Sequence, residues 1–280
     1  MQNITKKFNN LVSMEPVKKA TIFFYDILPS WCFPERHLRF KAYGVGMPKT
    51  GTITLYIMFS NHYQTKHEPE TRFFAKKILA FAHENQLNKN DFIKYVKQRD
   101  RRLGLEMNIS TLNLYLLDIL VNEFPESKFI LTIRDCYSWL DSFINHRLVY
   151  PKAWPLDNFR FGADRNKHTQ EEKILANNGL YTLDSYFSWW NTYNTRVLST
   201  IPPERLLVVK TPELNQSVPR IERFLGIMPG SLSASARGNV TTTKFNILSQ
   251  IDKNFLEEKA NFHCKELMDE YFPKVKGFNY

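Results

Sequence analysis

The chain has 280 residues, enough for one large domain or two small ones, and its 43% hydrophobic and 24% charged residues exclude a disordered or membrane-spanning chain. The 38 Lys and Arg residues outnumber the 28 Asp and Glu residues, and the net charge of +10 indicates a surface that attracts anions. Cys32, Cys136 and Cys264 lie far apart without the spacing of a zinc or redox site, which favours a reduced, cytoplasmic setting.

The predicted elements begin after an irregular N-terminal stretch. Residues 1–37 mix prolines with aromatic residues and predict a lead-in that packs on a main domain of residues 38–280. The apolar run at 20–28 is short and interrupted by an aspartate, so it predicts neither a signal peptide nor a transmembrane helix. Residues 40–47 then predict a buried strand that ends in glycines, and residues 52–62 predict a helix.

Further helices and strands alternate along the rest of the chain. Helices are predicted over 79–102, 111–123, 183–198 and 218–225, and strands over 128–134 and 206–210. Apolar strands between helices favour an α/β fold, a single domain whose central parallel sheet is covered by helices on both faces. Ligands of such sheets collect at the carboxyl ends of the strands, which directs attention to the loops that follow them.

A glycine-rich loop, GVGMPKTGT at residues 44–52, joins the first predicted strand to the first helix. Its backbone N–H groups and the helix N-terminus would converge on an anion such as phosphate. The spacing from Gly46 to Gly51 resembles the phosphate loop of ATP-dependent phosphotransferases, but that motif places its lysine after the last glycine. Here Thr52 stands there and the lysine is Lys49, so such an enzyme, with Asp135 as its metal-holding carboxylate, is kept as an alternative.

Two motifs resemble one known family. Pro48-Lys49-Thr50-Gly51-Thr52 resembles the 5′-phosphosulfate loop of sulfotransferases that use 3′-phosphoadenosine 5′-phosphosulfate, PAPS. After the strand at 128–134, Arg134 followed eight positions later by Ser142 resembles the family's 3′-phosphate element, and a guanidinium with a hydroxyl suits a dianionic phosphate. The stretch 236–239 resembles the family's late loop over the same phosphate. The resemblance covers residues 38–272.

The resemblance implies a P-loop-like nucleotide-binding architecture and an enzyme with PAPS as sulfuryl donor, its desulfated form PAP as product, and a small-molecule acceptor. It implies no metal, no nucleic acid and no membrane partner, and leaves the oligomeric state open. Ile53 replaces a hydroxyl common in the motif, and Thr54 stands where several animal members carry a tryptophan that stacks on adenine. The residues that the resemblance assigns to PAPS are Pro48, Lys49, Thr50, Gly51, Thr52, Ile53, Thr54, Arg134, Ser142, Arg237, Gly238 and Asn239.

The resemblance also suggests catalytic residues. Lys49 would balance the negative charge that grows on the bridging oxygen of the departing phosphate. Family members place a histidine or an acidic base after the strand that precedes the helix at 111–123, and Glu106 is the titratable residue of that stretch; the competing interpretation is a salt-bridged structural carboxylate. His67 and His62, beyond the first helix, are the other candidates, or else exposed polar residues.

Acceptor recognition is expected from residues 150–165 and from the aromatic residues of 186–190, unless these merely fill the core. They would suit a ring-bearing or alkaloid acceptor. The leading hypothesis is sulfuryl transfer to a hydroxyl or to an amine or guanidine nitrogen of a small molecule, as in natural-product tailoring. A basic polyanion-binding module that uses residues 89–102 remains a second alternative, although a charged helix face is usually only solvated.

Overall fold

The computed structural model describes residues 28, 32–34, 36–82, 88–151, 156–162, 166–238 and 243–278. Five strands in this part of the chain form one parallel sheet in the order β2-β3-β1-β4-β5. Because every pair is parallel, the carboxyl ends of all five strands lie along one edge of the sheet. The strands are β1 (Ala42–Gly44), β2 (Thr65–His67), β3 (Met107–Ile109), β4 (Lys128–Ile133) and β5 (Leu206–Lys210).

Helices surround this sheet. The α-helices are α3 (Thr52–Ser60), α4 (Thr71–Ala82), α5 (Lys89–Leu103), α6 (Leu117–Glu123), α7 (Cys136–Val149), α8 (Asp157–Phe161), α9 (Lys173–Asn177), α10 (Leu183–Thr200), α11 (Val218–Leu225) and α12 (Lys253–Tyr271). Short 3₁₀ turns are η2 (Thr111–Leu116), η3 (Pro203–Arg205), η4 (Thr211–Glu213), η5 (Asn215–Ser217) and η6 (Leu248–Gln250). None of the described helices combines the length and the apolar character that crossing a bilayer requires.

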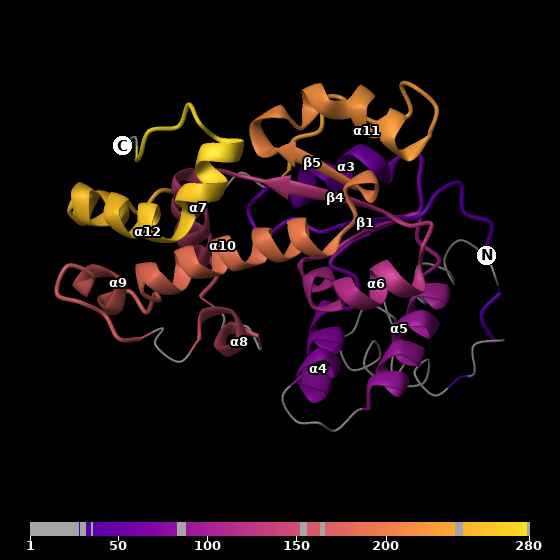
Figure 1. The fold of residues 1–280 in the computed structure, drawn as a ribbon, viewed down its shortest axis with the longest axis horizontal. Helices are drawn as coiled ribbons and strands as arrows, with labels where there is room; N and C mark the ends of the chain where they lie inside the picture. The colour runs from indigo at the N-terminus through magenta and orange to yellow at the C-terminus, as the bar shows by residue number, and fades with distance from the viewer. Residues whose placement is uncertain are drawn as a thin grey trace, which may run out of the picture.

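The two faces of the sheet bury separate apolar clusters. Along β4, Phe129 and Leu131 point into one cluster and Ile130 into the other, as the two-residue repeat of a strand dictates. Helices α3 and α11 cover the face of Ile130, while α4, α5, α6, α7, α10 and α12 contribute to the larger cluster (Figure 1). The predicted fold class, an α/β fold with helices on both faces of a parallel sheet, is therefore confirmed.

Several predicted elements differ from those in the structure. The strand predicted over 40–47 spans Ala42–Gly44, and the single helix predicted over 79–102 is two helices, α4 and α5. The helix predicted over 111–123 starts as a 3₁₀ turn, where the Ser110 hydroxyl accepts the Leu112 N–H, and becomes α-helical at Leu117. Strand β5 and helix α11 have the predicted bounds, and Gly226 caps α11 with a left-handed φ of 71°.

Residues 1–27 lie outside the described part of the chain, so the division into a lead-in and a main domain at residue 37 stays a prediction. Cys32, Cys136 and Cys264 carry free thiols in the structure. Cys136 and Cys264 are buried, from α7 and α12, and burial raises the pKa of the Cys136 thiol well above its ordinary value, with the Cys264 thiol beside it as a second cause.

Candidate functional site

A cavity of about 940 Å³ opens at the carboxyl edge of the sheet. Its walls come from the loops after β1, β2, β4 and β5, from α7, and from the segment that precedes η6. This is the position at which parallel sheets bind ligands, because the loops after the strands meet there. Cationic side chains outnumber carboxylates among the lining residues: Lys49, Arg72, Arg134, Arg160, Arg237 and Lys244 stand against Glu68.

Side chains from other parts of the fold hold the loop between β1 and α3 by donating hydrogen bonds to its carbonyl oxygens. Tyr193 donates to the Gly46 oxygen at 3.2 Å, Trp139 to the Pro48 oxygen at 3.0 Å, and Thr211 to the Thr50 oxygen at 2.7 Å. With these oxygens bound to protein, the loop can present N–H groups to an anion, and the helix ladder of α3 begins only at the bond from Leu55 N to Gly51 O.

Backbone geometry at two positions gives the loop its tight path. Lys49 and Gly51 have positive φ values of 69° and 92°, and a left-handed lysine is a strained conformation that packing must impose. Gly46 is a close approach: a Cβ there would lie 1.9 Å from Thr132 Oγ1. The sequence therefore needs a glycine at 46, and the strain at Lys49 makes the loop a candidate functional element.

Of the loop residues predicted to hold a nucleotide, Pro48, Lys49, Gly51, Thr52, Ile53 and Thr54 line the cavity. Thr50 does not, because its buried hydroxyl donates to the Met47 oxygen at 2.7 Å and lies 2.8 Å from Thr132 Oγ1. The Thr50 side chain thus braces the loop from below, and any contact of Thr50 with an anion would have to come from its backbone.

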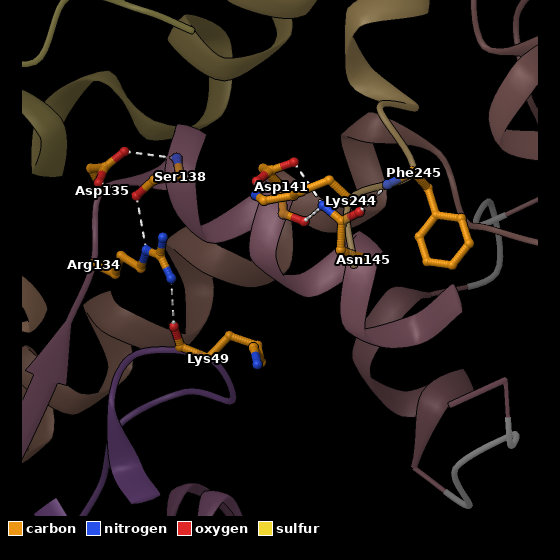
Figure 2. Close-up of polar contacts among 8 residues, drawn as sticks. All are labelled: Lys49, Arg134, Asp135, Ser138, Asp141, Asn145, Lys244 and Phe245. Atoms are coloured by element: carbon orange, nitrogen blue, oxygen red, sulfur yellow. Dashed lines mark hydrogen bonds and ion pairs between the residues drawn. The ribbon is translucent and has the colours of Figure 1, made fainter. Parts of the chain in front are cut away.

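Arg134 joins the loop to the start of α7. Its Nε donates to Ser138 Oγ at 2.9 Å and its Nη1 approaches the Lys49 oxygen at 3.4 Å (Figure 2). Burial lowers the pKa of both Lys49 and Arg134, and for Lys49 the charge of Arg134 is a second cause. Burial penalises the charge of both cations, and bound anions would offset that penalty, so the geometry favours an anionic ligand.

Helix α7 contributes the next part of the wall. Ser138, Ser142, Asn145 and His146 line the cavity at helical spacing, so the predicted Arg134 and Ser142 share one cavity with Lys49. Asp135, which caps α7 by accepting from Ser138 N at 2.8 Å, does not line it. The carboxylate that an ATP-dependent phosphotransferase would need for its metal ion is therefore committed to the helix cap.

The late segment reaches the same cavity. Arg237 and Gly238 line it, and Gly238 N donates to Thr54 Oγ1 at 3.2 Å. A Cβ at Gly238 would come within 2.5 Å of Ile53 Cγ2, so only glycine allows this segment to lie against the start of α3. Asn239, predicted to bind the nucleotide with them, lies outside the described residues.

His67 is the last residue of strand β2 and Glu68 follows it, and both line the cavity. His67 Nε2 lies 3.1 Å from Thr52 Oγ1, beside the glycine-rich loop. Burial lowers the pKa of His67 below the ordinary 6.5, with the charge of Glu68 acting in the opposite direction, so the imidazole is neutral at pH 7. A neutral imidazole next to the loop can accept a proton.

The carboxylate of Glu68 is held by the loop that follows strand β3. Oε1 accepts from Thr111 N at 2.8 Å and Oε2 from Ser110 Oγ at 2.7 Å, while the backbone of Glu68 has a positive φ of 49°. Sequence reasoning missed this residue, because its partners lie more than forty positions away. It likewise missed the cavity positions of Arg72, Ser138, Asn145, His146 and Lys244.

Glu106 lies at the opposite end of the sheet. The stretch expected to follow a strand contains strand β3 itself, and Glu106 precedes it. Its carboxylate accepts from Arg39 Nε at 2.7 Å, from Arg39 Nη2 at 2.8 Å and from Gln64 N at 2.8 Å, and the Arg39 bonds lower the pKa of Glu106 against the effect of burial. This is the structural carboxylate of the competing interpretation. His62 is also absent from the cavity and exposed.

The other expected contacts serve the fold. Tyr186, Phe187, Trp189 and Trp190 are buried in the larger core cluster, so the aromatic residues of α10 are core residues. Within the expected acceptor stretch 150–165, Arg160 lines the cavity, with its guanidinium 5.3 Å from the centre of the Trp189 ring. Residues 152–155 and 163–165 lie outside the described part.

Four of the six Lys and Arg residues of the basic cluster at 89–102 have carboxylate or carbonyl partners, whereas Lys89 and Lys94 are exposed. Arg99 and Arg102 pair with Glu70, at 3.3 and 2.6 Å, and Lys97 pairs with Glu123 at 2.8 Å. Arg101 Nε donates to the Phe33 oxygen at 2.8 Å. A face most of whose cations are occupied by carboxylates and carbonyls gives little support to a polyanion-binding module.

Comparison with known proteins agrees with this geometry. A family model described as a sulfotransferase domain matches residues 41–226, and no curated protein matches the chain. The solved structure of sulfotransferase STF9 from Mycobacterium avium has 13% identity and a TM-score of 0.52, over 92% of this chain and 82% of that one. A sulfotransferase from Alicyclobacillus acidocaldarius has 15% identity and a TM-score of 0.45, over 81% and 96%. The likeness to STF9, at 13% identity, shows the fold alone.

Proposed function

Because the chain belongs to the sulfotransferase family, as the match over residues 41–226 shows, we propose that it transfers the sulfuryl group of PAPS to a small-molecule acceptor. One observation carries the proposal: Lys49, Arg134 and Ser142, which come from three places in the sequence, line one cationic cavity at the carboxyl edge of the sheet. The cavity offers a separate anion-binding group to each end of a nucleotide that carries two charged ends.

The proposed donor contacts divide between two ends of the cavity. Lys49 and the N-terminal turn of α3, from Thr52 on, would bind the 5′-phosphosulfate. Arg134, Ser142 and Arg237 would bind the 3′-phosphate, with Gly238 close to the start of α3. Burial and the charge of Arg134 lower the pKa of Lys49. The negative charge of a bound donor would offset both effects, so donor binding would raise that pKa.

The proposed chemistry needs one base and one cation. The acceptor hydroxyl gives its proton to His67 as its oxygen attacks the sulfur, and the bond from sulfur to the bridging phosphate oxygen breaks. The electron pair of that bond stays on the phosphate oxygen of the departing PAP, where Lys49 stabilises the new charge. His67 suits the task because its imidazole is neutral at pH 7 and lies beside the loop, 3.1 Å from Thr52 Oγ1.

The charge of the cavity lining supports a hydroxyl acceptor over a cationic amine or guanidine. Arg72 and Arg160 are among the six Lys and Arg residues that line the cavity against one carboxylate, Glu68, and this excess of positive charge would repel a cationic acceptor. A hydroxyl-bearing natural product, neutral or anionic, therefore fits the cavity best, and tailoring of such a molecule is the role that we propose.

The first experiment compares nucleotides by thermal unfolding. PAP is expected to raise the unfolding midpoint, by the equivalent of about 2.7 kcal/mol at a concentration 100 times its Kd. ATP with Mg²⁺ is expected to raise it much less, because the cavity holds no free metal-binding carboxylate among the residues described. An equal response to both nucleotides would count against the proposal and favour a phosphotransferase.

The second experiment measures transfer of labelled sulfuryl from PAPS to phenols, alcohols, sugars, amines and guanidines. Product is expected with hydroxyl acceptors, and Lys49→Ala is expected to lower the turnover about 10²- to 10³-fold. Lys265→Ala, which removes an exposed lysine from α12, is the matched control for loss of one positive charge. Lack of transfer to every class, or equal losses in both variants, would contradict the assignment of Lys49.

A further inference from the structure

Polar contacts fasten the late segment, by which we mean residues 236–238 and 243–245, at two places. The first joins it to α3, where Gly238 N donates to Thr54 Oγ1 at 3.2 Å. Residues 239–242, which complete the connection, lie outside the described part of the chain. Thr54 occupies the position at which the family resemblance leads one to expect an aromatic platform, and in this chain its hydroxyl is engaged with the backbone of the late segment.

The second contact joins the late segment to α7. Lys244 forms an ion pair with Asp141, and Phe245 N donates to Asn145 Oδ1 at 2.8 Å (Figure 2). The Asn145 amide is itself fixed, because its Nδ2 donates to the Asp141 backbone oxygen at 2.7 Å and to Asp141 Oδ1 at 2.8 Å. Only 3% of Asn145 is exposed, so its acceptor oxygen has one defined position.

Packing holds Ala236 and brings Gly238 against Ile53, but it contributes less to the rest of the late segment. Ala236 and Ile247, on either side of the segment's outer part, are buried, but Arg237, Lys244 and Phe245 between them are exposed. Exposed residues gain less from apolar contact, so the hydrogen bonds to Thr54 and Asn145 and the ion pair to Asp141 contribute to the path of the backbone here. Those three partners belong to helices that also carry the proposed donor contacts, Thr52 on α3 and Ser142 on α7.

From this arrangement we propose that Thr54, Asp141 and Asn145 are positioning residues for the sulfuryl donor. They hold the late segment across α3 and α7, so that Arg237 and Gly238 stay within reach of the nucleotide's 3′-phosphate. The proposal rests on the proposed function. In this chain Thr54 acts through the late segment, and the two helices that bind the nucleotide also fix the third element of its site.

The first test uses an isosteric pair of variants at Thr54. Thr54→Val keeps the shape but removes the acceptor oxygen, whereas Thr54→Ser keeps the oxygen. Loss of one hydrogen bond predicts that Thr54→Val weakens PAP binding about 3- to 10-fold and raises the KM for PAPS to match, with a smaller change in kcat. Thr54→Ser is expected to bind PAP as the wild-type protein does. Equal affinities in all three proteins, or equal losses in both variants, would overturn the proposal.

The second test separates action through the late segment from direct contact with the nucleotide. In an Arg237→Ala background, Thr54→Val and Asp141→Asn are expected to cost little further PAP affinity, because the group that they position is gone. Full, additive losses would refute the positioning role, as Thr54 would then contact the nucleotide itself. Asn145→Leu adds a further variant to this double-mutant cycle. If the Asn145→Leu variant does not fold, Asp141→Asn still tests the contact with α7.

The wild-type protein distinguishes the two failures. If PAP does not bind wild-type protein at all, the proposed function is wrong and the cycle is not reached. If PAP binds the wild-type protein but each variant binds it equally well, the function stands and the positioning role is refuted.

Discussion

His67 and Lys49 are the two residues whose protonation would limit sulfuryl transfer, and they do so at opposite ends of the pH scale. His67 must be neutral to accept a proton, and burial holds its pKa below 6.5. Lys49 must be charged to stabilise the departing phosphate, and burial and Arg134 hold its pKa below 10.5. As the pH rises, His67 first loses its proton and can act as the proposed base, and Lys49 loses its positive charge at a higher pH.

We therefore expect a bell-shaped dependence of kcat/KM on pH, with an acid limb below 6.5 and an alkaline limb below 10.5. His67→Asn is expected to lower kcat about 10²- to 10⁴-fold and to remove the acid limb. The profile of kcat/KM at saturating acceptor checks both. An acid limb that persists in His67→Asn would assign the base to another residue, of which Glu68 is the nearest candidate.

Sequence reasoning succeeded at this scale where a short motif carries its own geometry. Lys49 follows strand β1, and the motif of Arg134 and Ser142 follows strand β4. Because parallel strands end at the same edge of the sheet, the sequence was enough to predict that these three residues line one cavity. It failed for Glu106 because β3 is three residues long, and a shift of a few positions exchanges one end of a strand for the other. No local pattern marks such a short strand.

The glycine-rich loop is the element whose shape depends most on one missing side chain. A Cβ at Gly46 would meet Thr132 Oγ1 at 1.9 Å and the Thr132 backbone oxygen at 2.9 Å. Thr132 cannot move aside easily, because its strand is buried and its hydroxyl lies 2.8 Å from Thr50 Oγ1. Overpacking at this point would shift the loop away from β4.

Gly46→Ala is accordingly expected to lower the free energy of unfolding by about 1–3 kcal/mol and to weaken PAP binding. Denaturant unfolding and PAP titration measure the two effects. Thr132→Ala in the same chain, which removes the nearer clash, is expected to restore part of the stability. Wild-type stability and affinity in Gly46→Ala would show that the loop does not need this close approach.

At the element scale, segments with an apolar run and a local boundary signal were predictable, and a short polar strand was not. The strand at 206–210 and the helix at 218–225 have the predicted bounds, because apolar runs and a C-terminal glycine define them locally. Strand β2 escaped prediction because its residues, Thr65-Lys66-His67, are polar and only its pairing with β3 makes it a strand. The proposed base lies on this unpredicted strand, which explains why its distance from the loop could not be foreseen.

For the whole molecule, the excess of positive charge bears on how the donor would be attracted. The net charge of +10 coincides with a cavity whose lining cations outnumber its carboxylates, so an anion is drawn to the molecule and then into the cavity. The pairing of Arg99 and Arg102 with Glu70 removes part of that charge from the surface of α5. The field is thus better suited to a small anion in the cavity than to an extended polyanion on the helix.

Salt is expected to weaken PAP binding several-fold between about 50 and 500 mM NaCl, because screening shortens the range of these charges. Adenosine 5′-monophosphate, which lacks the 3′-phosphate, is expected to bind more weakly and with a smaller salt dependence. Isothermal titration at several salt concentrations checks both slopes. Equal slopes would mean that the proposed Arg134 and Arg237 end of the cavity does not contact a phosphate.

The order of the strands also divides the chain between its two proposed substrates. Strand β1 stands in the middle of the sheet; residues 65–109 build the strands on one side of it, and residues 128–210 those on the other. The β2 side carries His67, the proposed base, and Arg72, whereas Arg134 and Ser142, which would bind the 3′-phosphate of the donor, follow β4 on the other side. Mutations that retune the choice of acceptor can therefore accumulate in one half of the sheet while the other half keeps the cosubstrate unchanged, so a single donor can serve descendants that modify different molecules.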